Sequence, residues 1–217
     1  MPSAIFSHQA PGLFLKVKYP KKLDGAALCF GTFVPDFDSI IGFFFPVNIR
    51  SLTHSLIGQI IWTIPIAILA TVIFCRFLAP ICSSIASQKS ILFEPLRYFG
   101  VNDWHYFKQK QFNRRFFYVA AYSAFIGGIT HLLLDWPSHA DVQLLWPWLL
   151  WPNPEFLTYS IANFGSISLG PLVLDMYLTV YSLLWLIESL VGLIISLYIL
   201  RYIKKKELIH EWYATFT

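Results

Sequence analysis

Histidine and aspartate residues suited to binding a metal ion fall in four short stretches of this sequence. The last stretch is the most informative, because His131 and Asp135 are four residues apart and would share one face of a helix. His139 repeats the spacing, although Pro137 is expected to end the helix before it. A helical His-x3-Asp pair with a further histidine is good metal-ligand geometry. The seven candidate ligands are His8, Asp36, Asp38, His54, His131, Asp135 and His139.

Each stretch also has a purely structural explanation. A lone histidine at a helix end is usually a satisfied interfacial residue, and Asp36 or Asp38 could cap a helix, since Asp is a favoured N-cap. This explanation weakens when the stretches are combined, because four of the six histidines and three aspartates fall at segment ends that one topology can bring together. Ionisable groups at membrane depth are costly and usually mark function. We therefore expect a metal site.

Seven candidates exceed the four ligands of a single structural zinc, which favours two ions with Asp36 bridging them. Mixed His and Asp ligation suits zinc, manganese or iron(II); the sequence does not choose among these divalent metals, and zinc is the first expectation. Such a centre would activate water and clamp the oxygens of a phosphoester. The expected reaction is hydrolysis, with Asp38 and Asp135 as the candidate catalytic carboxylates.

The composition places these residues in an integral membrane protein. Of the 217 residues, 56% are hydrophobic and only 13% are charged, whereas about a quarter of a soluble domain is charged. The apolar residues lie in blocks that approach the ~20 residues a membrane helix needs. The net charge of +4 comes from basic residues beside these blocks, which favours contact with anionic lipid headgroups over nucleic-acid binding. We predict one all-α membrane domain over residues 1–217.

The elements that must position the candidate ligands follow from the apolar blocks. Three full spans are predicted at residues 55–77, 116–134 and 172–202. Pro65 should kink the first span, and the Gly127-Gly128 pair should let another helix approach the second.

Two shorter helices and one loop complete the predicted bundle. Residues 23–45 are interrupted at Pro35, so the apolar part reaches only about 18 Å and predicts a buried half-helix that ends at the aspartates. A surface-lying amphipathic helix is predicted around residues 93–107. Residues 136–170 are rich in Trp and Pro, a composition typical of an interfacial loop.

Orientation follows from the basic residues. Arg76, six residues in loop 79–115 and four at 201–206 make eleven of the sixteen, and the other five lie in the N-terminal region. The positive-inside rule then places this loop and the C-terminus in the cytoplasm. His54 and His131 fall at the outward ends of their spans, and the expected location is the plasma (inner) membrane.

The same residues carry a resemblance to a known family. The segments Ser7 to Ala10, Gly31 to Phe37, Thr53 to Leu56 and Thr130 to His139 resemble, in order and spacing, the domain-of-unknown-function family 4184 of prokaryotic membrane proteins. The signature is also similar to that of membrane-bound metal-dependent hydrolases, where the matching residues are Asp36, Asp38, His54, His131 and Asp135. The family's last span carries Tyr, Gln and Ser, whereas this chain has Glu188 and no glutamine there, which leaves the role of Glu188 open.

Two functions from different classes are consistent with these observations. The first is a metal-dependent hydrolase that acts on a lipid or other amphiphilic phosphoester, with the Trp-rich segment 136–156 covering the site. The alternative is a non-enzymatic metal-binding membrane protein with a structural or metal-handling role. Transport is disfavoured because the first two spans contain few polar residues. Both functions require positions from His8 to His139 to converge at one end of the bundle.

Overall fold

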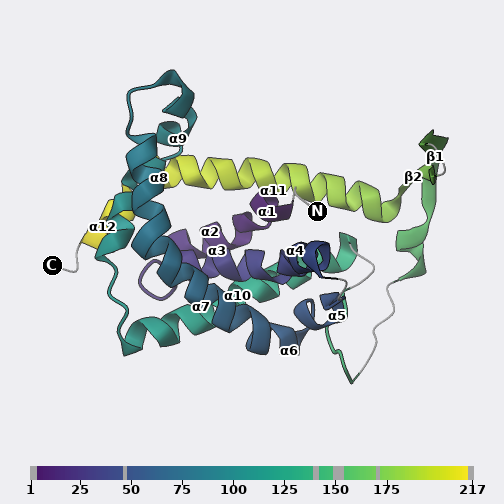
Figure 1. Ribbon diagram of the computed structural model, residues 1–217, viewed down its shortest axis with the longest axis horizontal. Helices are drawn as coiled ribbons and strands as arrows, with labels where there is room; N and C mark the ends of the chain where they lie inside the picture. Colours follow the sequence, from purple (N-terminus) through teal and green to yellow (C-terminus); the bar gives the residue numbers. More distant parts are fainter. Residues whose placement is uncertain (1–3, 46–47, 139–141, 149–153, 170–171, 215–217) are drawn as a thin grey trace.

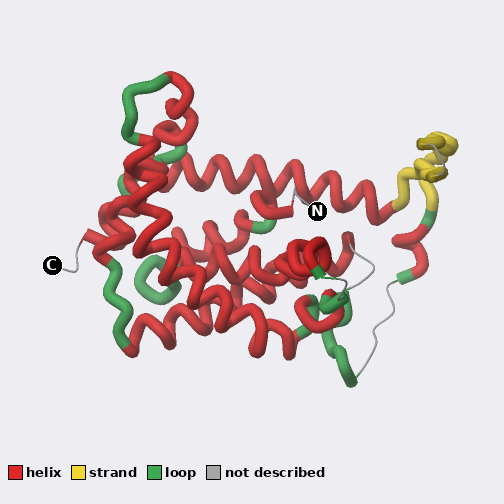
Figure 2. Tube along the Cα trace, viewed as in Figure 1, coloured by secondary structure: helices red, strands yellow, loops and turns green. Residues whose placement is uncertain are grey.

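The computed structural model describes residues 4–45, 48–138, 142–148, 154–169 and 172–214 (Figure 1). Its helices are α1 (Ala4–Ser7), α2 (Gln9–Lys18), α3 (Gly25–Phe33), α4 (Phe37–Phe44), α5 (Arg50–Thr53), α6 (Leu56–Gly58), α7 (Ile64–Ile73), α8 (Ala79–Ala86), α9 (Glu94–Tyr98), α10 (Arg114–Ser138), α11 (Val180–Lys205) and α12 (Leu208–Ala214). Its strands are β1 (Ser160–Leu169) and β2 (Leu172–Thr179). Figure 2 shows that helix dominates and that the strands form one small arm beyond α11.

Three helical stretches are long and apolar enough to cross a membrane, which confirms the predicted all-α membrane bundle. They are Leu56–Ala86, Arg114–Pro137 and Val180–Lys205. The first contains α6, α7 and α8, joined by π turns at Gln59–Thr63 and Phe74–Leu78. Each π turn directly precedes a helix that carries proline in its first two positions, where the missing N–H breaks the regular ladder. The helical stretch therefore continues past the predicted end at residue 77.

The predicted start of the third span is wrong. Residues 172–179 form β2, which pairs antiparallel with β1, and α11 begins only at Val180. Thr179 ends the strand and caps the helix, since its side-chain oxygen accepts a hydrogen bond from the Ser182 amide. A short apolar run fits a strand as well as a helix, so its hydrophobicity alone did not distinguish the two.

The predicted amphipathic helix over residues 93–107 is also not continuous. α9 ends at Tyr98, and a 3-10 segment follows from Val101 to Gln109. Gly100 separates them with a φ of 83°, a left-handed conformation that a continuous helix excludes.

The core of the bundle is α3, which packs against both α7 and α10 (Figure 1). A Cβ atom on Gly127 would lie 2.3 Å from the Leu28 carbonyl oxygen, so this glycine lets the backbones of α10 and α3 approach, as predicted. The half-helix also agrees with the prediction, because α3 gives way at Val34–Asp36 to a 3-10 turn that contains Pro35.

The N-terminal region forms helices that were not predicted. α1 and α2 pack against α11, where the Ser196 hydroxyl donates a hydrogen bond to the Phe6 carbonyl oxygen at 2.9 Å. α2 starts beside His8 and ends at Lys18, so it connects two ends of the bundle. At its far end Lys16 lies over the ring of Trp212 in α12, at 4.7 Å.

Candidate metal centre

Four side chains from distant parts of the sequence converge at one end of the bundle. Asp36 lies in the 3-10 turn that follows α3, and His54 follows α5. His131 and Asp135 lie one turn apart on α10. One ligand atom from each of the four lies within 4.8 Å of all the others. Asp36, His54, His131 and Asp135 are called the His/Asp cluster below.

The distances within the His/Asp cluster match those between the ligands of one metal ion. His131 Nε2 lies 3.3 Å from Asp135 Oδ2 and 3.4 Å from His54 Nε2, and His54 Nε2 lies 3.4 Å from Asp135 Oδ2. Asp36 Oδ1 lies 3.6 Å from His54 Nε2 and 3.7 Å from His131 Nε2. Ligands placed tetrahedrally about 2.0–2.1 Å from zinc are roughly 3.3–3.4 Å apart. Five of the six distances among the four atoms therefore lie within about 0.4 Å of the tetrahedral values, and all four atoms lie within 4.8 Å of one another.

Three of the four cluster side chains are shielded from solvent, and the fourth, Asp36, is partly exposed. The side chains of His54 and His131 are fully buried and that of Asp135 is 1% exposed, whereas that of Asp36 is 16% exposed. Water or a substrate would therefore reach an ion from the side of Asp36.

The ring of His54 is oriented by the Thr53 hydroxyl, which takes part in two hydrogen bonds. The Thr53 hydroxyl donates to the Arg50 carbonyl oxygen at 3.2 Å, so its oxygen can accept from His54 Nδ1, which lies 2.9 Å away. With Nδ1 as the donor to Thr53, Nε2 is the ring nitrogen that faces Asp36, His131 and Asp135. The loop carrying His54 is held in turn by Gln59, whose amide donates to the Thr53 carbonyl oxygen at 2.8 Å.

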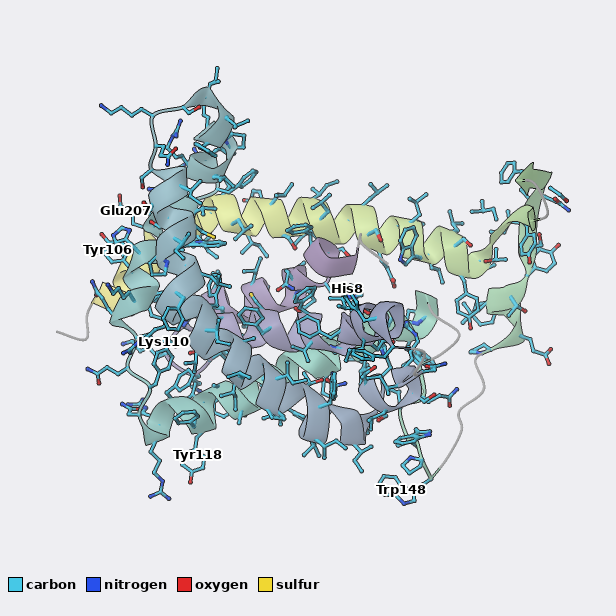
Figure 3. The ribbon with its side chains drawn as sticks, viewed as in Figure 1. His8, Tyr106, Lys110, Tyr118, Trp148 and Glu207 are labelled. Carbon is cyan, nitrogen blue, oxygen red and sulfur yellow. The ribbon has the colours of Figure 1, made fainter. Side chains whose placement is uncertain are left out.

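His8 contacts the cluster from behind. Its Nδ1 lies 3.0 Å from Nδ1 of His131, and its Nε2 lies 3.5 Å from Asp135 Oδ1. Both contacts involve the atoms of His131 and Asp135 that face away from the other ligands. His8 is buried between the α1–α2 turn and α10 (Figure 3). In this position it orients two ligands and lies outside the group of four.

Asp38 is close to the cluster but is turned toward Arg50. Asp38 Oδ2 lies 3.4 Å from Arg50 Nη1, and Arg50 Nη2 lies 3.9 Å from Asp135 Oδ2. From the sequence, Arg50 was interpreted only as one of the basic residues that set the membrane topology, so it was not a candidate site residue. A signal was present, since Arg50 is the sole Lys, Arg, Asp or Glu between residues 39 and 75.

The seventh candidate, His139, lies outside the described residues. In the Trp-rich segment, residues 142–148 contact the start of α6, where the Leu56 amide donates to the Leu144 carbonyl oxygen at 3.0 Å. Part of this loop therefore packs beside the turn that carries His54.

Comparison with known proteins identifies the family. The sequence profile of the family described as Domain of unknown function (DUF4184) matches residues 1–215. The chain belongs to this family. No curated protein and no solved structure matches the chain.

The electrostatics of this DUF4184 chain favour a cation in the cluster. Burial alone would raise the pKa of Asp36, but a hydrogen bond from His54 and the charge of His131 bring it below its usual value. Burial would lower the pKa of His54, but hydrogen bonds to Asp135 and Asp36 raise it above its usual value. Without a metal, His54 thus favours a proton shared with the carboxylates, in the place a divalent ion would take.

Proposed function

We propose that this protein is a membrane-embedded metal-dependent hydrolase that acts on a phosphoester of a lipid or another amphiphile. The observation that carries the proposal is the set of five interatomic distances of 3.3–3.7 Å among Asp36, His54, His131 and Asp135. Buried carboxylates need a partner, and a divalent ion together with Arg50 would neutralise Asp36, Asp38 and Asp135.

Three residues of the cluster would bind the ion, and the fourth is the candidate general base. His54, His131 and Asp135 are buried and would hold the ion, with zinc expected first and manganese or iron as alternatives. Asp36 faces the open side, where it would complete the coordination or accept the proton of the attacking water. A bound divalent ion supplies activation of water and polarisation of the phosphoryl oxygens. Asp38 would act through Arg50 instead of binding the ion itself.

The geometry supports one ion more directly than the two expected from the sequence. A second ion would draw on His8, Asp38 and His139, which are the remaining candidates. Of these, His8 contacts the outer atoms of His131 and Asp135, and Asp38 pairs with Arg50. Metal analysis of the purified protein decides the number.

The surroundings of the cluster support an amphiphilic substrate. α4 follows Asp36 directly, buries Asp38 and exposes Ile40 and Phe44, the latter with 70% of its side-chain surface accessible. Trp148, in the loop beside α6, is 78% exposed. Such a rim suits the membrane–water interface, where apolar and aromatic groups meet lipid headgroups.

We propose an orientation with the cluster on the outward side of the plasma membrane and the C-terminus in the cytoplasm. His131 is 17 residues beyond Arg114 on α10, which is about 26 Å along the helix. The N-terminal lysines also lie at the end opposite the cluster, because α2 leads away from His8 and Lys16 contacts α12. Their position therefore agrees with the positive-inside rule, whereas Arg50 stands on the cluster side.

Two measurements test the function. Metal analysis of wild-type protein and of His131→Ala should give about one divalent ion per chain in the first and none in the second. Wild-type protein should then hydrolyse a chromogenic phosphodiester or a phospholipid in a broad screen, and chelation should abolish turnover.

A structural role for the ion is the second candidate, because four protein ligands around one ion are typical of closed structural sites. Stoichiometric metal without turnover of any phosphoester or lipid would favour this role. In that case, metal removal should lower the unfolding temperature strongly.

A further inference from the structure

We propose that Arg50 is the receptor for an anionic phosphoryl group of the substrate and that Asp38 positions it. This inference rests on the proposed function of the His/Asp cluster. It assigns to the site a substrate that carries at least one negative charge, and it gives Asp38 a positioning role.

Arg50 lies close enough to the His/Asp cluster for one bound phosphoryl group to contact both. Its guanidinium lies between two carboxylates, with Nη1 3.4 Å from Asp38 and Nη2 3.9 Å from Asp135 Oδ2. The same Asp135 oxygen lies 3.3–3.4 Å from the Nε2 atoms of His131 and His54. A phosphoryl group bound to an ion held by the cluster would therefore have a second oxygen within reach of Arg50. The planar fork of a guanidinium matches two phosphoryl oxygens.

Arg50 also stands at the open side of the site. The Arg50 side chain is 20% exposed, comparable to Asp36, while the three other cluster residues are closed off. An incoming anion would thus meet Arg50 before it meets the buried histidines. A partly desolvated guanidinium at an entrance attracts anions and strengthens the hydrogen bonds made to them.

The position of Arg50 in the bundle argues against a merely topological role. The lysines of α2 and the basic residues of α10 and α11 gather at the opposite end. Arg50 is the only Lys or Arg in the apolar sequence from residue 39 to residue 75. A single basic residue that opposes the overall charge asymmetry is explained by its local charge partners, the carboxylates beside it and an anion that would enter the site, and not by topology.

Asp38 contacts the edge of the Arg50 guanidinium that faces away from the His/Asp cluster. Asp38 is buried, and its contact with Nη1 leaves Nη2 directed toward Asp135. When Asp135 binds an ion, part of its charge is shared with that ion, which weakens its attraction for Arg50 Nη2 and favours the approach of a phosphoryl group. Asp38 would then fix the direction of the fork and reduce the entropy lost on binding.

The test measures binding of inorganic phosphate to the metal-loaded full-length protein by calorimetry, so it does not depend on turnover. Arg50→Gln should weaken phosphate binding about tenfold to a hundredfold, the range expected for a charge-assisted hydrogen bond. Arg50→Lys keeps the positive charge but loses the planar guanidinium, so its phosphate affinity should lie between those of the wild type and Arg50→Gln. Arg114→Gln, at the opposite end of α10, is the matched control and should bind phosphate like the wild type. Metal content is measured for every variant.

Asp38→Asn supplies a readout that a merely structural role would not move. It should weaken phosphate binding in the wild-type background and have no further effect in Arg50→Gln. Nanodiscs with and without phosphatidic acid distinguish the source of the phosphoryl group. Competition by phosphatidic acid assigns a lipid headgroup, and lack of competition assigns a soluble phosphate.

Several outcomes would overturn the inference. Equal phosphate affinity in the wild type and Arg50→Gln, both with metal bound, would remove Arg50 from recognition. If Arg50→Gln fails to retain metal, an unchanged affinity in Arg50→Lys would have the same consequence. Wild-type protein that holds metal and binds no phosphate also contradicts it. Phosphate binding that requires Arg50 in a protein without turnover would sustain the inference while the hydrolase proposal fails.

Discussion

Two buried polar clusters, one at each end of the bundle, solve the problem of burying charge in different ways. At the end opposite the His/Asp cluster, Lys16 Nζ donates to the carbonyl oxygens of Pro20 and Leu23 at 2.7 and 2.9 Å. Lys110 forms an ion pair with Asp24, whose other oxygen accepts from the Ala27 amide at 2.9 Å. Lys16, Asp24 and Lys110 are called the Lys/Asp cluster below, and in it each charge faces a complementary group.

The His/Asp cluster has the opposite character. Its four facing atoms are two carboxylate oxygens and two imidazole nitrogens, all of which are acceptors when unprotonated. Such a group is stable only when protons or a cation lie between the acceptors. The Lys/Asp cluster is therefore complete as a structural element, whereas the His/Asp cluster is the proposed position of a metal ion. The predictions below test this difference between the two clusters.

The largest expected effect is loss of the ion from Asp135→Asn. The substitution keeps the shape of the side chain but removes a charged ligand that lies within 3.4 Å of both cluster histidines. Metal analysis of the purified protein should fall from about one ion per chain to nearly none. Asp24→Asn, the corresponding change in the Lys/Asp cluster, should retain the ion. Equal metal content in both variants would contradict the distinction between the clusters.

The next effect is on stability and belongs to the Lys/Asp cluster. Asp24→Asn keeps a good N-cap for α3 but leaves Lys110 buried without its counter-ion. Removing one partner of a buried ion pair costs about 3–5 kcal/mol. The free energy of unfolding in detergent should drop by that amount. Asp103→Asn is the control, because its pair with Lys204 is partly exposed and should contribute at most about 1 kcal/mol.

A third effect is the contribution that Lys16, in the Lys/Asp cluster, makes to the pH dependence of stability at alkaline pH. Burial lowers the pKa of Lys16 from 10.5 to about 8, opposed by the charge of Asp24 and assisted by that of Lys110. Between these pH values the unfolded chain holds a proton that the folded protein has released, so the free energy of unfolding rises with pH. The difference corresponds to roughly 3 kcal/mol over the whole window.

Lys16→Met isolates this contribution, because it keeps the apolar stem and removes the titrating group. Between about pH 7.5 and about pH 10, the free energy of unfolding of the wild type should rise relative to that of Lys16→Met. Parallel pH profiles in the two proteins would show that Lys16 titrates near its ordinary value. The metal content should be the same in both.

Much of the framework could be predicted because its determinants are local. The spans around α7 and α10 follow from long apolar runs, and the end of α3 follows from Pro35, which interrupts such a run. β2 was missed because its partner β1 stabilises it, and the apolar residues 172–179 fit either structure. α2 was missed because its short amphiphilic sequence is fixed by packing against α11, which lies far along the chain.

The site divides in the same way. His131 and Asp135 share a helix face by spacing alone, so their proximity could be predicted. His8 was predicted as a ligand, but whether its ring faces an ion or the outer nitrogen of His131 depends on tertiary packing. Asp38 was predicted as a catalytic ligand, and its contact with Arg50 depends on α5 folding back onto α4. The catalytic and metal-binding roles remain predictions.

The smallest expected effect tests whether the His/Asp cluster is preorganised. Thr53→Val preserves shape but removes the oxygen that accepts from His54 Nδ1 at 2.9 Å. Without this acceptor, the proton can move to Nε2, the atom that faces the other ligands, and the ring is no longer held. Loss of such an orienting partner typically lowers metal affinity about tenfold to a hundredfold. Competition with a chelating dye measures the affinity. Thr71→Val is the matched control, since Thr71 is equally buried but bonds only to the Ala67 carbonyl oxygen within α7, among the contacts described. Unchanged metal affinity in Thr53→Val would mean that the ion itself orients His54. The His/Asp cluster would then depend on its ion for its geometry, whereas the Lys/Asp cluster needs no added ion.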